Sequence, residues 1–154
     1  MSAGGFAVRA LERTDVAGLT DLWVEAWRAT GIAVDFEARR EWFAAHLEKL
    51  AARGAEIIVA VEASGALAGF VTIDAASGHL DQLCVAPARQ GGRIAPSLLD
   101  AAKALAPGLV RLEVNADNAR ACRFYRREGF VETGRGVSQA SGLPILLMEW
   151  RRAS

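Results

Sequence analysis

The feature that most constrains the fold is the stretch LCVAPARQGGRIAPSLL at residues 83–99, where a short apolar run meets two glycines and then a helical pattern. A second apolar run, LVRLEVN, follows this predicted helix directly. A strand, a crossover helix and a second strand in this order form a right-handed unit with parallel strands. We therefore expect an α/β fold that contains this unit.

The segments on either side of this unit add further strands and helices. Upstream we expect a short strand at 6–9, a helix that Thr14 or Asp15 caps, and a second helix over roughly 36–52. The runs EIIVAVE and LAGFVTI then predict a hairpin, and HLDQLCV extends it to an antiparallel meander. DNARACRFYRREG predicts a further helix, and FVETGRGV and PILLMEW predict the last two strands. No repeat or linker divides residues 1–154, so we expect a single domain.

Composition and charge limit the classes of function. Hydrophobic residues make up 52% of the 154 residues and charged residues 23%, which is an ordinary globular composition. Eighteen basic and eighteen acidic residues give a formal net charge of zero, so we expect no nucleic acid or anionic membrane as partner. The sequence contains no apolar stretch of membrane-spanning length and no signal-peptide pattern at its start, which favours a cytoplasmic protein. Cys84 and Cys122 fit no metal-ligand spacing, so we expect neither a disulfide framework nor a metal site.

The glycines at 91 and 92 suggest an anion site. Glycines between a strand and a helix let backbone amides approach an anion, and the helix N-terminus adds a favourable field. The P-loop requires a Lys-Ser or Lys-Thr pair after the glycines, and the dinucleotide fingerprint requires G-x-G-x-x-G; the sequence contains neither. On their own, Gly91 and Gly92 are better explained by the sterics of a strand-to-helix turn, where glycines are more often steric than functional.

Two spaced motifs favour the anion site. Residues 83–99 resemble the acyl-CoA signature of the GCN5-related N-acetyltransferase (GNAT) superfamily, which runs Val-x-Pro, two residues, Gln or Arg, two residues, Gly, one residue, then Gly or Ala. Residues 112–130 resemble the second motif of that family, and the order of the elements resembles its fold over nearly the full chain. The matching residues are Val85, Pro87, Gln90 and Ala95 in the first motif, and Asn115, Asn118, Phe124, Tyr125, Gly129 and Phe130 in the second.

The resemblance implies a fold and a cofactor. The fold would be a mixed, mostly antiparallel sheet of about seven strands with a splayed central parallel pair, flanked by about four helices. The co-substrate would be acetyl-CoA, with its pantetheine arm on the backbone of Leu83 and Val85 and its pyrophosphate on the amides of residues 90–95. The implied cofactor-binding residues are Leu83, Cys84, Val85, Gln90, Gly91, Gly92, Arg93, Ile94, Ala95, Asn118 and Tyr125.

Arg93 departs from the signature, which usually has glycine at this position. If the backbone there requires a positive φ, a side chain costs roughly 1–2 kcal/mol and weakens CoA binding. If φ is ordinary, Gly92 provides the close approach and Arg93 can donate to a phosphate of CoA. We favour the phosphate contact.

Tyr125 falls on the general-acid position of the family and is the only tyrosine of the chain. A phenol with a pKa of about 10 can donate a hydrogen bond or a proton to the thiolate that leaves a thioester. The alternative is a tyrosine that only packs beside Phe124 on an amphipathic helix. Asn118 would contact the cofactor, cap the helix that follows it, or do both.

The general base is expected to be His79, which can take the proton of an ammonium acceptor directly or through water. Strand alternation places Asp81 on the same face, where it would orient the imidazole if no bulge intervenes. The alternative is a solvated histidine in a turn, with Glu113 and Asp74 as lesser candidates for the base. Cys84 has no adjacent base that would make it an acetyl carrier, so we expect a buried thiol.

These observations together predict an acetyltransferase that moves the acetyl group of acetyl-CoA to an amine by direct attack in a ternary complex. We expect a small-molecule or amino-acid acceptor, because no acidic run is present to hold a basic protein tail. The alternative is a CoA-binding regulatory module without transfer activity; longer acyl groups stay open. Trp23, Trp27 and Trp42 are most simply core residues, although one of them can line the acceptor pocket. The tryptophan content and the apolar last strand ILLMEW favour a homodimer.

Overall fold

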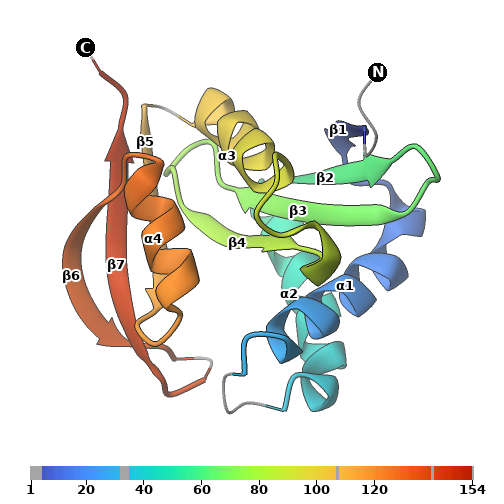
Figure 1. Cartoon of the computed structure of the whole chain (residues 1–154), viewed down its shortest axis with the longest axis horizontal. Coiled ribbons are helices and arrows are strands. Elements are labelled where there is room, and N and C mark those ends of the chain that lie inside the picture. Colours follow the sequence, from blue (N-terminus) through green and yellow to red (C-terminus); the bar gives the residue numbers. More distant parts are fainter. Residues whose placement is uncertain (1–4, 32–34, 107, 140, 154) are drawn as a thin grey trace.

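The computed structural model describes residues 5–31, 35–106, 108–139 and 141–153. These residues form seven strands and four α-helices (Figure 1), which confirms the predicted fold class and the predicted order of elements. Three short 3₁₀ helices precede α-helices along the chain: η1 (Arg13–Asp15), η2 (Glu37–Arg39) and η3 (Pro87–Arg89).

The first sheet is an antiparallel meander of four strands in sequence order. Its members are β1 (Phe6–Ala10), β2 (Glu56–Glu62), β3 (Leu67–Ile73) and β4 (Leu80–Val85). The predicted hairpin and meander are therefore confirmed. Val59 and Phe70 pack in a cluster on one face of this sheet, while Val71 and Ile73 pack in a second cluster on the other. Since both faces are covered, the two central strands are almost continuously apolar.

The helices cover the two faces of this sheet, as Figure 1 shows. Helices α1 (Val16–Arg28) and α2 (Arg40–Ala52) lie on one side, and α3 (Ile94–Leu105) lies on the other. Asp15 precedes α1, but its carboxylate accepts from the amide of Glu12 at 2.7 Å and not from an amide of α1. None of the helices in the described ranges has the length and apolarity that crossing a membrane requires.

The second sheet has the strand order β5-β7-β6 and is antiparallel. It consists of β5 (Leu109–Asn115), β6 (Val131–Val137) and β7 (Pro144–Arg151), with α4 (Ala119–Arg127) between β5 and β6 in the chain. Because β7 is the central strand, its residues Ile145, Leu146 and Met148 are buried in the monomer. The apolar last strand therefore gives no support to a homodimer, and the oligomeric state stays a prediction.

The two sheets meet along β4 and β5, which run parallel and then separate (Figure 1). A single parallel bridge joins His79 to Arg111, where the Arg111 amide donates to the Gly78 carbonyl at 2.9 Å. Beyond this bridge the described residues form no ladder between β4 and β5. The expected splayed pair is thus present, and the gap that it leaves lies at the centre of the molecule.

Candidate active site

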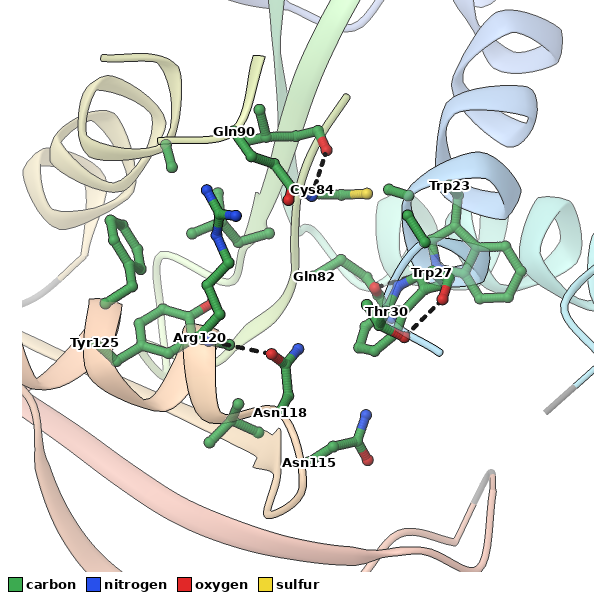
Figure 2. Close-up of a pocket in the computed structure, with 18 of the residues that line it drawn as sticks. Trp23, Trp27, Thr30, Gln82, Cys84, Gln90, Asn115, Asn118, Arg120 and Tyr125 are labelled. Atoms are coloured by element: carbon green, nitrogen blue, oxygen red, sulfur yellow. Dashed lines mark hydrogen bonds between the residues drawn. The ribbon is translucent and has the colours of Figure 1, made fainter. Parts of the chain in front are cut away.

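A cleft of about 890 Å³ occupies the gap between β4 and β5. Figure 2 shows its two sides: Gln90, Arg120 and Tyr125 lie on one side, and Trp23, Trp27 and Thr30 of α1 and the turn after it lie on the other. The β4 side chains of Gln82 and Cys84 lie between them. The cleft therefore brings together both predicted motifs and the first two helices.

The backbone of β4 offers unpaired groups to this cleft. The Ala86 amide donates to the Ala68 carbonyl of the neighbouring chain segment at 2.8 Å. Because backbone groups alternate along an antiparallel ladder, those of Leu83 and Val85 point away from β3 and toward β5. Only a long contact of 3.4 Å, from Gln90 Nε2 to the Val85 carbonyl, uses this edge within the described chain. The edge fits the role that the resemblance implies for Leu83 and Val85.

A cluster of free amides lies at the start of α3. Backbone hydrogen bonds of the described residues leave the amides of 91–93 unused, and those of Ile94 and Ala95 belong to the first helical turn. Gly91 has a φ of +85°, and a Cβ built there would lie 3.3 Å from Nη2 of Arg120. The turn therefore needs a glycine at 91 and presents several donors beside a guanidinium, which suits a phosphate.

The structure decides between the two alternatives for the backbone of Arg93, while its contact with a phosphate stays a prediction. Its φ of −91° and ψ of −10° are ordinary helical values, so the strain alternative is wrong. The positive φ and the close approach both fall on Gly91, not on Gly92 or Arg93. The Arg93 side chain is not part of the cleft lining, and that of Ile94 is buried in the core. Arg120, which the sequence reading did not consider, lies beside the glycine turn instead (Figure 2).

Tyr125 lines the cleft from α4 and is 7% exposed. Its ring makes edge contacts with Phe124 at 5.3 Å and Phe130 at 5.4 Å between centroids. Burial raises the pKa of the Tyr125 phenol above its ordinary value, and the thiols of Cys84 and Cys122 add to this shift. The hydroxyl is therefore held in its protonated form at neutral pH, as a proton donor requires.

Two further predicted residues have clear structural roles. The Asn118 side chain accepts from the Ala121 amide at 3.1 Å, so the predicted helix cap is confirmed, and Asn118 also lines the cleft. Cys84 is buried, and burial raises the pKa of its thiol to about 12. A thiol with this pKa is not a nucleophile at neutral pH, in agreement with the expected buried thiol.

The structure does not bring His79 into the cleft. His79 lies at the bridge to Arg111, outside the lining residues. The pairing of β3 with β4 shifts between Val71 and Ile73, and this bulge lies opposite Asp81. Asp81 consequently faces α2, where its Oδ2 lies 2.6 Å from Nε2 of His46. The predicted orientation of His79 by Asp81 is therefore wrong, because a bulge does intervene.

His46 and Asp81 form a partly buried pair that the sequence reading missed. Their side chains are 23% and 21% exposed, and both line the cleft. Burial alone would raise the pKa of Asp81, but the hydrogen bond and charge of His46, together with smaller contributions from His79 and Gln82, outweigh it, so the pKa is lowered. The two residues lie 35 positions apart in the sequence, so no local pattern pairs them. The one local indication of a role for His46 is Trp42, four positions earlier; the Trp42 ring stacks on the imidazole with 4.7 Å between centroids.

The family of the chain follows from comparison with known proteins. Residues 32–152 match the model of the acetyltransferase (GNAT) domain. The chain belongs to the GNAT family. It is 39% identical over 70 residues to the peptidyl-lysine N-acetyltransferase YjaB of Salmonella typhimurium, a match that covers 46% of this chain and 48% of that protein. The match to this curated relative therefore spans only about half of its length.

Solved structures share the GNAT fold along nearly the whole chain. The solution structure of apo YjaB from Escherichia coli has a TM-score of 0.74 and 24% identity, and the match covers 97% of this chain and 99% of that one. The PaiA N-acetyltransferase of Thermoplasma acidophilum, solved in complex with coenzyme A, has a TM-score of 0.78 and 22% identity over 96% and 99% of the two chains. At these identities the likeness shows the fold alone.

Proposed function

We propose that this GNAT-family chain transfers the acetyl group of acetyl-CoA to the amine of a small molecule or amino acid. The observation that carries the proposal is the convergence of three features on one cleft. These are the free backbone edge of β4, the amides at the start of α3 and the protonated hydroxyl of Tyr125.

The residues of the cleft fit acetyl-CoA. The amides of 91–95 and the guanidinium of Arg120 would hold its phosphates, since together they supply donors and positive charge around a turn in which Gly91 has a positive φ. Leu83 and Val85 would pair with its amide-containing arm through their free backbone groups. When bound, acetyl-CoA supplies the activated acetyl thioester.

The chain's own residues then handle two protons. Tyr125 donates the proton of its hydroxyl to the thiolate sulfur that leaves the thioester. The raised pKa of Tyr125 keeps the hydroxyl protonated before this step. The His46–Asp81 pair replaces His79 as our candidate for the group that takes the proton of the ammonium acceptor. In this pair the Asp81 carboxylate orients the imidazole through their contact of 2.6 Å.

The acceptor is the finer part of the proposal. The Salmonella relative is named a peptidyl-lysine N-acetyltransferase, and a chimera built from the spermidine N-acetyltransferase SpeG has a TM-score of 0.67 to this chain. Both names indicate amines as acceptors for those proteins. A net charge of zero and the lack of an acidic run in the sequence favour a small amine here over a basic protein tail. A cytoplasmic location stays a prediction.

One experiment separates the enzyme from a CoA-binding module without activity. Thiol release from acetyl-CoA is followed across a panel of amines, while CoA binding is measured by calorimetry on the same protein. The proposal predicts release that depends on the amine and saturates with it. A protein that binds CoA saturably, yet releases no thiol with any amine, is a binding module.

A further inference from the structure

The end of the cleft that faces α1 and α2 is an aromatic wall. Its ring centroids lie close together: 5.4 Å between Trp23 and Phe36, 5.5 Å between Trp27 and Phe36, and 4.7 Å between Trp42 and His46. Trp42 nevertheless remains 39% exposed. All members of the wall, which are Trp23, Trp27, Phe36, Trp42 and His46, line the cleft. The fold thus leaves an ordered aromatic surface exposed to a ligand at this end of the cleft.

Polar side chains at the foot of the wall are fixed by one another. Asp81 is bonded to His46, and Trp23 donates its indole N–H to Gln82 Oε1 at 3.3 Å. Asp81 is the only carboxylate that the described residues of α1, η2, α2 and β4 contribute to the cleft lining. The acidic residues Glu113 and Asp117 line it from β5 and the loop after β5. The aromatic end therefore carries one carboxylate, which its contact with His46 holds in place.

The aromatic wall and the single carboxylate of Asp81 together favour some classes of amine over others as ligands. The faces of indole rings attract a cation, and they cover apolar carbon well. A single carboxylate satisfies one ammonium, whereas the further ammonium groups of a polyamine would find no second carboxylate among the described residues of α1, η2, α2 and β4 that line this end. A strongly polar acceptor would gain nothing from the open surface of Trp42.

We propose that the aromatic wall and Asp81 bind a primary amine with a single positive charge and a flat or apolar skeleton, such as an aryl-alkylamine, as the acetyl acceptor. The inference rests on the proposed function, because it takes this cleft as the acceptor site. The ammonium group lies against the His46–Asp81 pair, and the apolar skeleton lies along the wall at Trp42. This places the nitrogen beside the group that takes its proton.

The test is calorimetric binding of three probes to the protein saturated with CoA: phenylethylamine, spermidine and Nα-acetyl-lysine amide. We expect phenylethylamine to bind at least about tenfold more tightly than the other two, because it alone brings an aromatic ring to the wall, and tenfold corresponds to about one aromatic ring pair. Tighter binding of spermidine or of the lysine derivative overturns the inference, and so does the failure of all three amines to bind.

Variants locate the binding surface. Trp42→Ala should weaken phenylethylamine binding by about 5- to 30-fold, while Trp42→Phe, which keeps a ring, should stay within about threefold of the unaltered protein. Asp81→Asn should weaken it by about tenfold or more, because it removes a charged acceptor. Glu41→Ala, next to Trp42 but exposed and outside the cleft lining, is the matched control and should change nothing.

CoA affinity, measured on each variant, shows that the variant is folded. If Trp42→Ala loses CoA binding as well, Asp81→Asn still decides the question. Unchanged phenylethylamine affinity in a folded Trp42→Ala or Asp81→Asn protein overturns the inference. Tight phenylethylamine binding without any acetyl transfer would defeat the proposed function, and with it the role of the amine as acceptor, but not the binding surface. Transfer that prefers spermidine would defeat this inference and leave the proposed function standing.

Discussion

Replacing Tyr125 with phenylalanine removes the proposed proton donor and keeps the ring between Phe124 and Phe130. Among the described residues, none forms a hydrogen bond with the hydroxyl, so the variant loses no internal bond. We therefore expect the free energy of unfolding to change by less than about 0.5 kcal/mol. A general acid contributes about 10²–10⁴ in rate, which corresponds to roughly 2.7–5.4 kcal/mol of activation free energy.

The assay is steady-state thiol release from acetyl-CoA with a saturating amine, together with calorimetric CoA binding. The loss should fall on kcat, with the CoA dissociation constant unchanged, because the hydroxyl acts on charge that develops during the reaction. A phenol donates only while protonated, and burial raises the pKa of Tyr125. The rate of the unaltered enzyme should therefore fall only above the ordinary tyrosine pKa of about 10, and this alkaline limb should vanish in Tyr125→Phe.

Two outcomes would refute this reasoning. A folded Tyr125→Phe protein that keeps more than about a third of the rate lies far outside the range of a general acid. An alkaline limb that persists unchanged in the variant would assign the titration to another group. In either case Tyr125 is a packing residue, and the thiolate leaves with the help of water or of the helix N-terminus.

Three further predictions concern the neighbouring groups. Arg120→Ala should raise the CoA dissociation constant by about tenfold or more in calorimetry and flatten its salt dependence, whereas Arg93→Ala should leave both nearly unchanged. Gly91→Val should weaken CoA binding at least tenfold and cost about 1–2 kcal/mol of stability in denaturant unfolding, because φ is positive there. The lowered pKa of Asp81 means that its stabilising contribution is present above its unfolded pKa of about 3.9 and is lost as the pH falls through the folded value. Asp81→Asn should therefore flatten the acid limb of the stability profile; an acid limb as steep as before would show that Asp81 does not carry it.

Local patterns in the sequence were sufficient for most of the fold. The hairpin of β2 and β3, the crossover through α3 and the Asn118 cap each depend on neighbouring residues, and all were predicted. The central position of β7 was not predicted, because strand order in a sheet depends on pairings between distant segments. An apolar edge strand and an apolar central strand look alike in sequence.

The candidate site likewise contains residues that local patterns predicted and residues that depend on contacts between distant segments. The glycine turn and Tyr125 follow from two contiguous motifs, so the sequence identified them. The direction of Asp81 depends on a bulge, and the register of β4 against β3 that creates the bulge is not visible in either strand alone. His46 and Arg120 reach the cleft from elements whose packing only the folded chain defines. The arginine beside the glycine turn is therefore Arg120 of the second motif, although the sequence drew attention to Arg93 of the first motif.

A crystal structure of the protein with CoA tests the central claim most directly, namely that one cleft holds the phosphates at the start of α3 and the sulfur at Tyr125. We predict the pyrophosphate on the amides of residues 91–95 beside Arg120, the arm along Leu83 and Val85, and the sulfur within about 3.5 Å of the Tyr125 hydroxyl oxygen. A complex in which the phosphates are bound elsewhere, or in which the sulfur lies out of reach of Tyr125, would contradict the account.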